Sequence, residues 1–164
     1  MEARYVPLVG QRSIEALIQT GDLKKVAPTL ALALKEVSAS DKHARLAELA
    51  VANDLHTAGV SPLWSAYRHA FNGWLRMQGL EVVGSEGQHL VTLQAIETQY
   101  KNLLPTIIAN AKEARRMRNE FEYETLADST PAVADEDIVH AVAQLPKLAT
   151  VTGNLLDRIP IYGR

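Results

Sequence analysis

The residues of this chain best suited to chemistry are three arginines, an asparagine and a tyrosine that fall within nine residues. They belong to segment 111–124, which reads Ala-Lys-Glu-Ala-Arg-Arg-Met-Arg-Asn-Glu-Phe-Glu-Tyr-Glu. A guanidinium group matches a phosphate group with two parallel hydrogen bonds, so clustered arginines indicate a site for a phosphate-bearing ligand. The apolar residues at 114, 117 and 121 recur at the spacing of one helical face. We therefore predict a helix that packs by one face and carries its cationic side chains beside that face.

Helical geometry divides the polar side chains of this segment into two stripes. One contains Arg116, Asn119 and Tyr123, and the other contains Arg115, Arg118 and Glu122. All six are candidate site residues. The alternative is a solvated helix face whose arginines are neutralised by the glutamates at 113, 120, 122 and 124.

Two histidines, His69 and His89, are predicted to lie on different helices that could approach one another. A metal site would need a further ligand, nothing nearby supplies one, and the chain has no cysteine. No metal and no other cofactor is therefore expected. A structural role is the plainer interpretation of both histidines, although His89 is kept as a candidate ligand contact.

Length, charge and hydropathy indicate one domain without membrane contact. The chain has 164 residues, of which 47% are hydrophobic, and its formal net charge is -2, so phosphate recognition must come from a local cluster. The N-terminus lacks the apolar run of a signal peptide. No stretch approaches the roughly 18 consecutive apolar residues of a membrane-spanning helix, so a cytoplasmic location is expected.

Apolar spacing and cap signals predict an all-α fold with short extra helices in its N-terminal part. Ser13 is expected to cap a first helix over 14–20, and Asp22 a second helix. The second helix has Leu30, Leu34 and Val37 in its interior, and Pro28 marks either a late start or a kink. Ser40 offers the next cap, before a helix over 42–57.

Three longer helices are expected in the rest of the chain: residues 63–77 after the cap Ser61, a helix from 88 through the arginine segment, and a helix from 135 onward. Pro105 and Pro146 should bend the second and third of these. The aromatic residues at 64, 67, 71 and 74 are expected in a core or a dimer interface. The connections are loops, in which residues 80–83 could be extended without an obvious partner, and the tail is expected to fray.

Two stretches resemble the HEPN domain family (higher eukaryotes and prokaryotes nucleotide-binding). The first is 65–71, Ser-Ala-Tyr-Arg-His-Ala-Phe, followed by Gly79 and by Glu-Gly-Gln-His at 86–89. The second is 115–123, Arg-Arg-Met-Arg-Asn-Glu-Phe-Glu-Tyr. The resemblance covers about residues 41–158 and implies an up-and-down helical bundle over that range. Residues 1–40 would then be an N-terminal helical extension, and residues 159–164 a tail.

The resemblance also implies a function. Family members are usually homodimers with a positive cleft at the dimer seam. Many are metal-independent endoribonucleases, often toxins paired with an antitoxin that can be a minimal nucleotidyltransferase. Their motif is an arginine, commonly followed by a polar residue, and a histidine after a spacer of four to six residues. Here Arg118 and Asn119 match its first half, which gives Arg118 a catalytic position, and Tyr123 stands in place of the histidine. Arg116, with a spacer of six residues before Tyr123, fits the same motif, so either arginine could pair with the tyrosine.

The replacement of histidine by Tyr123 bears on catalysis. Histidine titrates near neutrality, whereas tyrosine, with a pKa of about 10, mainly donates a hydrogen bond. We therefore expect a nucleotide- or RNA-phosphate-binding homodimer of a prokaryotic toxin–antitoxin or defence system, without efficient catalysis. One alternative is a metal-independent endoribonuclease toxin that uses Arg118 and Tyr123. Another is a non-enzymatic dimeric interaction protein with no nucleotide ligand.

Overall fold

The computed structural model describes residues 10–84, 88–123 and 133–162, apart from the side chains of Gln11, Glu122 and Tyr123. Most of these residues are helical, which confirms the predicted all-α class at this level. The elements follow in the order α1 (Gln11–Gln19), β1 (Leu23–Lys25), α2 (Leu30–Ala52), the 3-10 helix η1 (His56–Gly59), α3 (Val60–Gln78), β2 (Leu80–Val82), α4 (Gln88–Tyr100), α5 (Pro105–Tyr123), α6 (Asp135–Ala143), α7 (Leu145–Leu155) and the 3-10 helix η3 (Leu156–Arg158).

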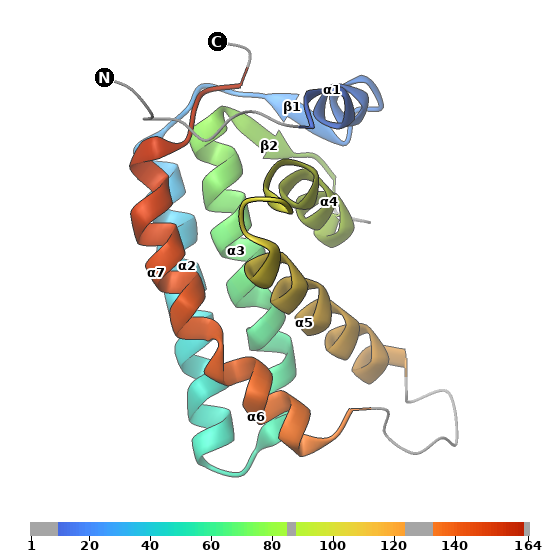
Figure 1. The fold of residues 1–164 in the computed structure, drawn as a ribbon, viewed down its shortest axis with the longest axis vertical. Helices are drawn as coiled ribbons and strands as arrows, with labels where there is room; N and C mark the ends of the chain where they lie inside the picture. The colour runs from blue at the N-terminus through green and yellow to red at the C-terminus, as the bar shows by residue number, and fades with distance from the viewer. Residues whose placement is uncertain (1–9, 85–87, 124–132, 163–164) are drawn as a thin grey trace.

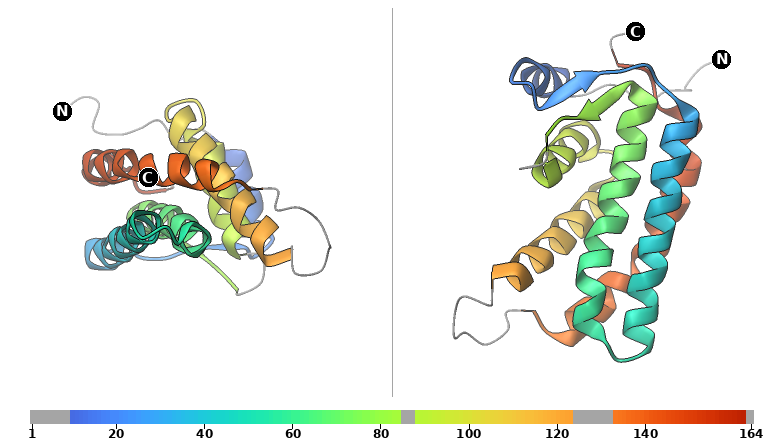
Figure 2. Two further views of the ribbon diagram at one scale, coloured as in Figure 1. Left: turned by 90° about the horizontal axis from the view of Figure 1, so that it is seen from below. Right: turned by 180° about the vertical axis from the view of Figure 1, so that it is seen from behind.

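Helix α3 is the central element of the fold. Helices α2 and α7 run along one side of it, and α4 and α5 lie on the other side (Figure 1). The view from behind shows α3 between α2 and α5, with α1, β1 and β2 grouped at one end (Figure 2). The exposed side chains of α3 are therefore bordered by two different helices.

The aromatic side chains of α3 form the centre of the core. Trp64, Tyr67, Phe71 and Trp74 are all 0% exposed, so they occupy the first of the two placements expected from their spacing. The indole nitrogen of Trp74 donates a hydrogen bond to Oγ1 of Thr152, 3.2 Å away, and so links α3 to α7. Burial of four large rings makes α3 a rigid support for the polar side chains on its remaining face.

Small side chains let α2 and α3 approach closely. The facing positions recur every seven residues and are Ala33, Ser40 and Ala47 on one side and Gly59, Ala66 and Gly73 on the other. A Cβ atom on Gly73 would lie 3.2 Å from the carbonyl oxygen of Ala33. The hydroxyl of Ser40, which is 5% exposed, donates to the carbonyl oxygen of Ala66 at 2.7 Å.

Two predictions for the N-terminal part of the chain are wrong. Ser40 does not cap a helix, because α2 runs unbroken through it and its hydroxyl bonds to α3 instead. The predicted boundary between residues 40 and 41 therefore falls inside α2. Asp22 does not cap a helix either, because the residues after it form β1, and the second helix begins only at Leu30, the late start that Pro28 indicates. Strand β1 pairs antiparallel with β2, with Leu23 opposite Val82. The extended residues that follow Gly79 thus have a partner.

Helix boundaries also differ from the expectation. Gly10 and Gly59, rather than Ser13 and Ser61, occupy the N-cap positions of α1 and α3. The helix expected to bend at Pro105 is instead two helices, because the chain leaves α4 after Tyr100 and Pro105 begins α5.

The helix expected to bend at Pro146 is also two helices. A break at Gln144 separates α6 from α7, with Pro146 in the first turn of α7. The tail is anchored rather than frayed as far as it is described. The backbone N–H of Tyr162 donates to the carbonyl oxygen of Gln78 at 2.8 Å, and its hydroxyl donates to Glu15 at 2.7 Å.

Candidate functional site

Helix α5 packs by the face that the sequence predicts. Ala111, Ala114 and Met117 are at most 1% exposed, and Phe121 packs partly buried against the same core. The arginines on either side of this face are therefore fixed in direction by the packing of the helix, and the structure separates them into two groups.

Arg116 belongs to the solvent-facing group. Its Nε and Nη2 donate to the two carboxylate oxygens of Glu113 at 2.8 and 2.5 Å, and its Nη1 donates to Glu120 at 2.5 Å. These hydrogen bonds raise the pKa of Arg116 and lower that of Glu113. With 43% of its side chain exposed, Arg116 matches the alternative of a solvated face neutralised by glutamates.

Arg118 and Arg115 belong to the inward-facing group. Both are half-buried, and the Nε of Arg115 is buried with no hydrogen-bond partner among the described residues. Arg118 lies close enough to Arg68 of α3 for its charge to act on that side chain. The two helices thus bring together two guanidinium groups that are 50 residues apart in the sequence.

Arg68 and Arg118 form an arginine pair, and the surroundings of Arg68 disfavour its charged form. Burial lowers its pKa, the charge of Arg118 lowers it further, and the charge of Glu36 opposes the change. The Nε of Arg68 is also buried with no hydrogen-bond partner among the described residues. Both observations mean that the charged guanidinium of Arg68 is destabilising in the ligand-free protein, and a bound anion would offset this effect.

A three-residue relay connects Arg68 to α2. Nη2 of Arg68 lies 3.2 Å from Nε2 of His69, and Nδ1 of His69 lies 2.6 Å from the carboxylate of Glu36. An arginine can only donate, so Nε2 of His69 must accept, and its proton must be on Nδ1, where it is donated to Glu36. When the ring of His69 is neutral, the relay therefore holds it in one defined tautomer.

His43 of α2 covers this relay. Its ring stacks on that of His69, with centroids 5.1 Å apart and planes 7° from parallel. Burial lowers the pKa of His43, and the charges of His69 and Arg68 act in the same direction. Its Nδ1 is buried and has no hydrogen-bond partner in the described part of the chain. A neutral ring is the form that this position favours.

The other predicted site residues are placed as follows. Asn119 is half-buried on α5. His89 accepts a hydrogen bond at Nδ1 from the indole nitrogen of Trp64, 2.7 Å away, which anchors the start of α4 to the core. The side chains of Glu122 and Tyr123, including the predicted catalytic phenol, lie outside the described residues.

Sequence reasoning selected Arg118 but not its companions Arg68, Glu36 and His43. They come from other helices, and no local spacing relates them to segment 111–124. One signal was available, since Arg68 and His69 belong to the stretch 65–71 that carried half of the family resemblance.

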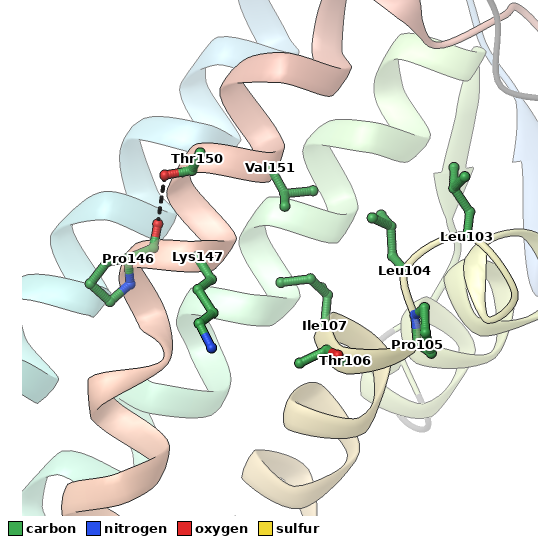
Figure 3. A pocket seen from close by; sticks show the side chains of 9 residues that line it. All are labelled: Leu103, Leu104, Pro105, Thr106, Ile107, Pro146, Lys147, Thr150 and Val151. Atoms are coloured by element: carbon green, nitrogen blue, oxygen red, sulfur yellow. Dashed lines mark hydrogen bonds between the residues drawn. The ribbon is translucent and has the colours of Figure 1, made fainter.

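A separate apolar pocket of about 550 Å³ lies between the start of α5 and α7. Figure 3 shows Leu104, Ile107 and Val151 pointing toward one another in it, with Lys147 at its border. The amine of Lys147 donates to Gln144 at 2.8 Å. The arginine pair lies elsewhere, on α3 and further along α5, so this pocket is distinct from the candidate site.

The arrangement is suited to binding an anion. It offers two guanidinium groups of different helices, backed by a relay that fixes an imidazole. Among the described residues, no group of three or more histidine, cysteine or acidic side chains is placed to hold a metal ion. Within the same ranges, no helix has the length and apolar character needed to cross a membrane. Comparison of the chain with protein-family models, curated proteins and solved structures gave no match.

Proposed function

We propose that this protein binds the phosphate group of a nucleotide or RNA through Arg68 and Arg118. The observation that carries the proposal is the meeting of these two arginines at a half-buried position, where burial and the nearby charge of Arg118 both lower the pKa of Arg68. Two like charges at such a position are held most favourably around a doubly charged anion. A phosphate group accepts paired hydrogen bonds from each guanidinium, which suits it better than a singly charged carboxylate.

We further propose that the protein is of the HEPN type. The two stretches that carry the resemblance, 65–71 and 115–123, contribute one arginine each to the same site, and the fold is mostly helical. A homodimer, and a role in a prokaryotic toxin–antitoxin or defence system, belong to this proposal and are tested by the molar mass in solution and by co-purification with a nucleotidyltransferase.

One observation favours a second candidate, a metal-independent endoribonuclease. The sequence lacks the motif histidine, but His69 has its Nδ1–H held by a carboxylate, which is how a general base is oriented. If Arg68 turns from His69 to a phosphate group, Nε2 becomes free to accept the proton of a ribose 2′-hydroxyl. His69→Gln should then abolish RNA cleavage in the presence of EDTA and leave RNA binding intact. Absence of cleavage by the wild type would reject this candidate and leave the binding function standing.

The binding function is tested by calorimetric titration of the wild type and of three variants with ribonucleoside 5′-monophosphates and a short single-stranded RNA. Arg68→Gln and Arg118→Gln each remove one guanidinium of the pair. Arg116→Gln is the matched control, because it makes the same change in net charge and lies on α5 together with Arg118. The arginine that it removes forms ion pairs with Glu113 and Glu120 on the solvent-facing side.

We expect the first two variants to lose about tenfold or more in affinity, the equivalent of one charged hydrogen bond. The control should stay within about twofold of the wild type, since only long-range charge is altered. Equal losses in all three variants would mean that binding follows net charge rather than this site. No binding by the wild type would favour the non-enzymatic interaction protein.

A further inference from the structure

A second pocket, of about 580 Å³, lies where α2, η1 and the first turns of α3 meet. Its apolar wall includes Leu46, Leu49, Leu55 and Ala58, and its polar lining includes His43 and Ser65. Leu46, Leu49 and Leu55 are 54%, 53% and 61% exposed. Three large apolar side chains that each remain more than half exposed around one cavity form a surface that gains stability when it is covered.

This leucine pocket adjoins the proposed phosphate site. His43 lines the pocket and also stacks on His69, which bonds to Arg68. Ser65 lines the pocket and precedes Arg68 by three residues on α3, a rise of about 4.5 Å along the helix. Residues three and four apart lie on the same face of a helix, so Ser65 in the pocket lining lies on the same face of α3 as Arg68.

We infer that the leucine pocket binds the nucleobase of the ligand whose phosphate group is bound by Arg68 and Arg118. The inference rests on the proposed function and assigns a place to the base of that nucleotide or RNA ligand, which the phosphate site alone does not bind.

The chemistry of the pocket fits a base. A nucleobase has two flat, weakly polar faces, which pack against leucine side chains and can continue the imidazole stack of His69 and His43. Its edge carries donors and acceptors, for which the pocket offers the hydroxyl of Ser65. The volume is within the range of small-ligand pockets, about 300–1,000 Å³.

The experiment compares two kinds of probe that have the same sugar and phosphate and differ in whether they carry a base. Ribose 5-phosphate and the four ribonucleoside 5′-monophosphates are titrated into the full chain. Two pocket variants are used: Ala58→Phe fills the cavity from an exposed position, and Leu49→Ala removes part of its wall. Leu34→Ala is the matched control, because Leu34 is an exposed leucine of the same helix, at 49%, outside the pocket. Light scattering gives the molar mass of every variant.

We expect at least one nucleotide to bind the wild type about fivefold or more tightly than ribose 5-phosphate, as base stacking predicts. Ala58→Phe and Leu49→Ala should abolish this preference and leave the affinity for ribose 5-phosphate unchanged, and Leu34→Ala should keep both. Equal affinity of the wild type for all the probes would overturn the inference while the phosphate site stands. A change in molar mass with an intact preference would also overturn it, because the pocket would then be a protein–protein contact. If neither kind of probe binds, the proposed function itself fails.

Discussion

Glu36→Gln should lower the stability of the ligand-free protein and strengthen its binding of phosphate-bearing ligands. The carboxylate of Glu36 accepts the hydrogen bond of His69 at 2.6 Å, and it is the negative charge that favours the charged form of Arg68. The substitution keeps the shape of the side chain and removes its charge. Without the negative charge of Glu36, the repulsion between Arg68 and Arg118 is less well compensated in the ligand-free protein. A bound anion, in turn, no longer lies near that negative charge.

Both magnitudes follow from the geometry. Replacing a charged acceptor by a neutral one costs about 1 kcal/mol, and the lost compensation of Arg68 adds a similar amount, for a total of about 1–2 kcal/mol. The lower part of that range is the better guide, because 29% of the Glu36 side chain is exposed and solvent screens its charge. For a chain of this length the melting temperature should fall by roughly 2–8 °C. Removal of one nearby negative charge should tighten phosphate binding by about 1 kcal/mol, or about fivefold.

The assay is urea denaturation together with calorimetric titration of the same preparations, at low and at high salt. Glu113→Gln is the control, because it removes a carboxylate that pairs with the solvent-facing Arg116. The control should change the free energy of unfolding by less than about 0.5 kcal/mol and leave phosphate affinity unchanged. Weaker or unchanged phosphate binding by Glu36→Gln, at the expected loss of stability, would refute the placement of the anion at Arg68 and Arg118.

Further predictions concern stability. Gly79→Ala should cost about 1–3 kcal/mol in urea denaturation, because φ is +79° and a Cβ would lie 2.8 Å from the carbonyl oxygen of Val26. Gly84→Ala, at φ +87° in open space, should cost less. Burial lowers the pKa of His43 below 6.5, so the unfolded chain binds the proton first, and stability should fall as pH drops below 6.5. His43→Phe should flatten that dependence in denaturation midpoints measured between pH 5 and 8. Ser40→Leu should destabilise more than Ser40→Ala, which loses only the hydrogen bond to α3, about 1 kcal/mol.

Local patterns predicted the helices better than their connections. The apolar spacing of α3 and of the arginine segment fixed which faces are buried, because that spacing reflects the helix itself. Ser40 was misread because a serine followed by an aspartate resembles a helix cap, whereas here its hydroxyl satisfies a carbonyl of the neighbouring helix. Small residues that recur every seven positions on α2 and α3 are visible in the sequence, and this spacing indicates two long helices in close contact. The pairing of β1 with β2 spans only three residues on each strand and leaves no periodic signal.

The site was predictable only in part, because its residues come from several helices. Arg118 stood out because it lies in a dense cluster, but density alone does not separate it from Arg116, whose charge is taken up by glutamates one turn away on either side. The separation depends on which face of α5 meets α3. Arg68 and Glu36 are recognised only when three helices are assembled, because their interactions join residues far apart in the chain.

The most direct test of the account is a nuclear magnetic resonance titration that follows the arginine side-chain Nε–H signals during addition of a nucleotide. Arginine variants assign the signals. If Arg68 and Arg118 bind the phosphate group, their signals shift together along one binding curve, while that of Arg116 stays in place. A shift confined to Arg116, or no shift of Arg68 and Arg118 at concentrations where calorimetry detects binding, would contradict it.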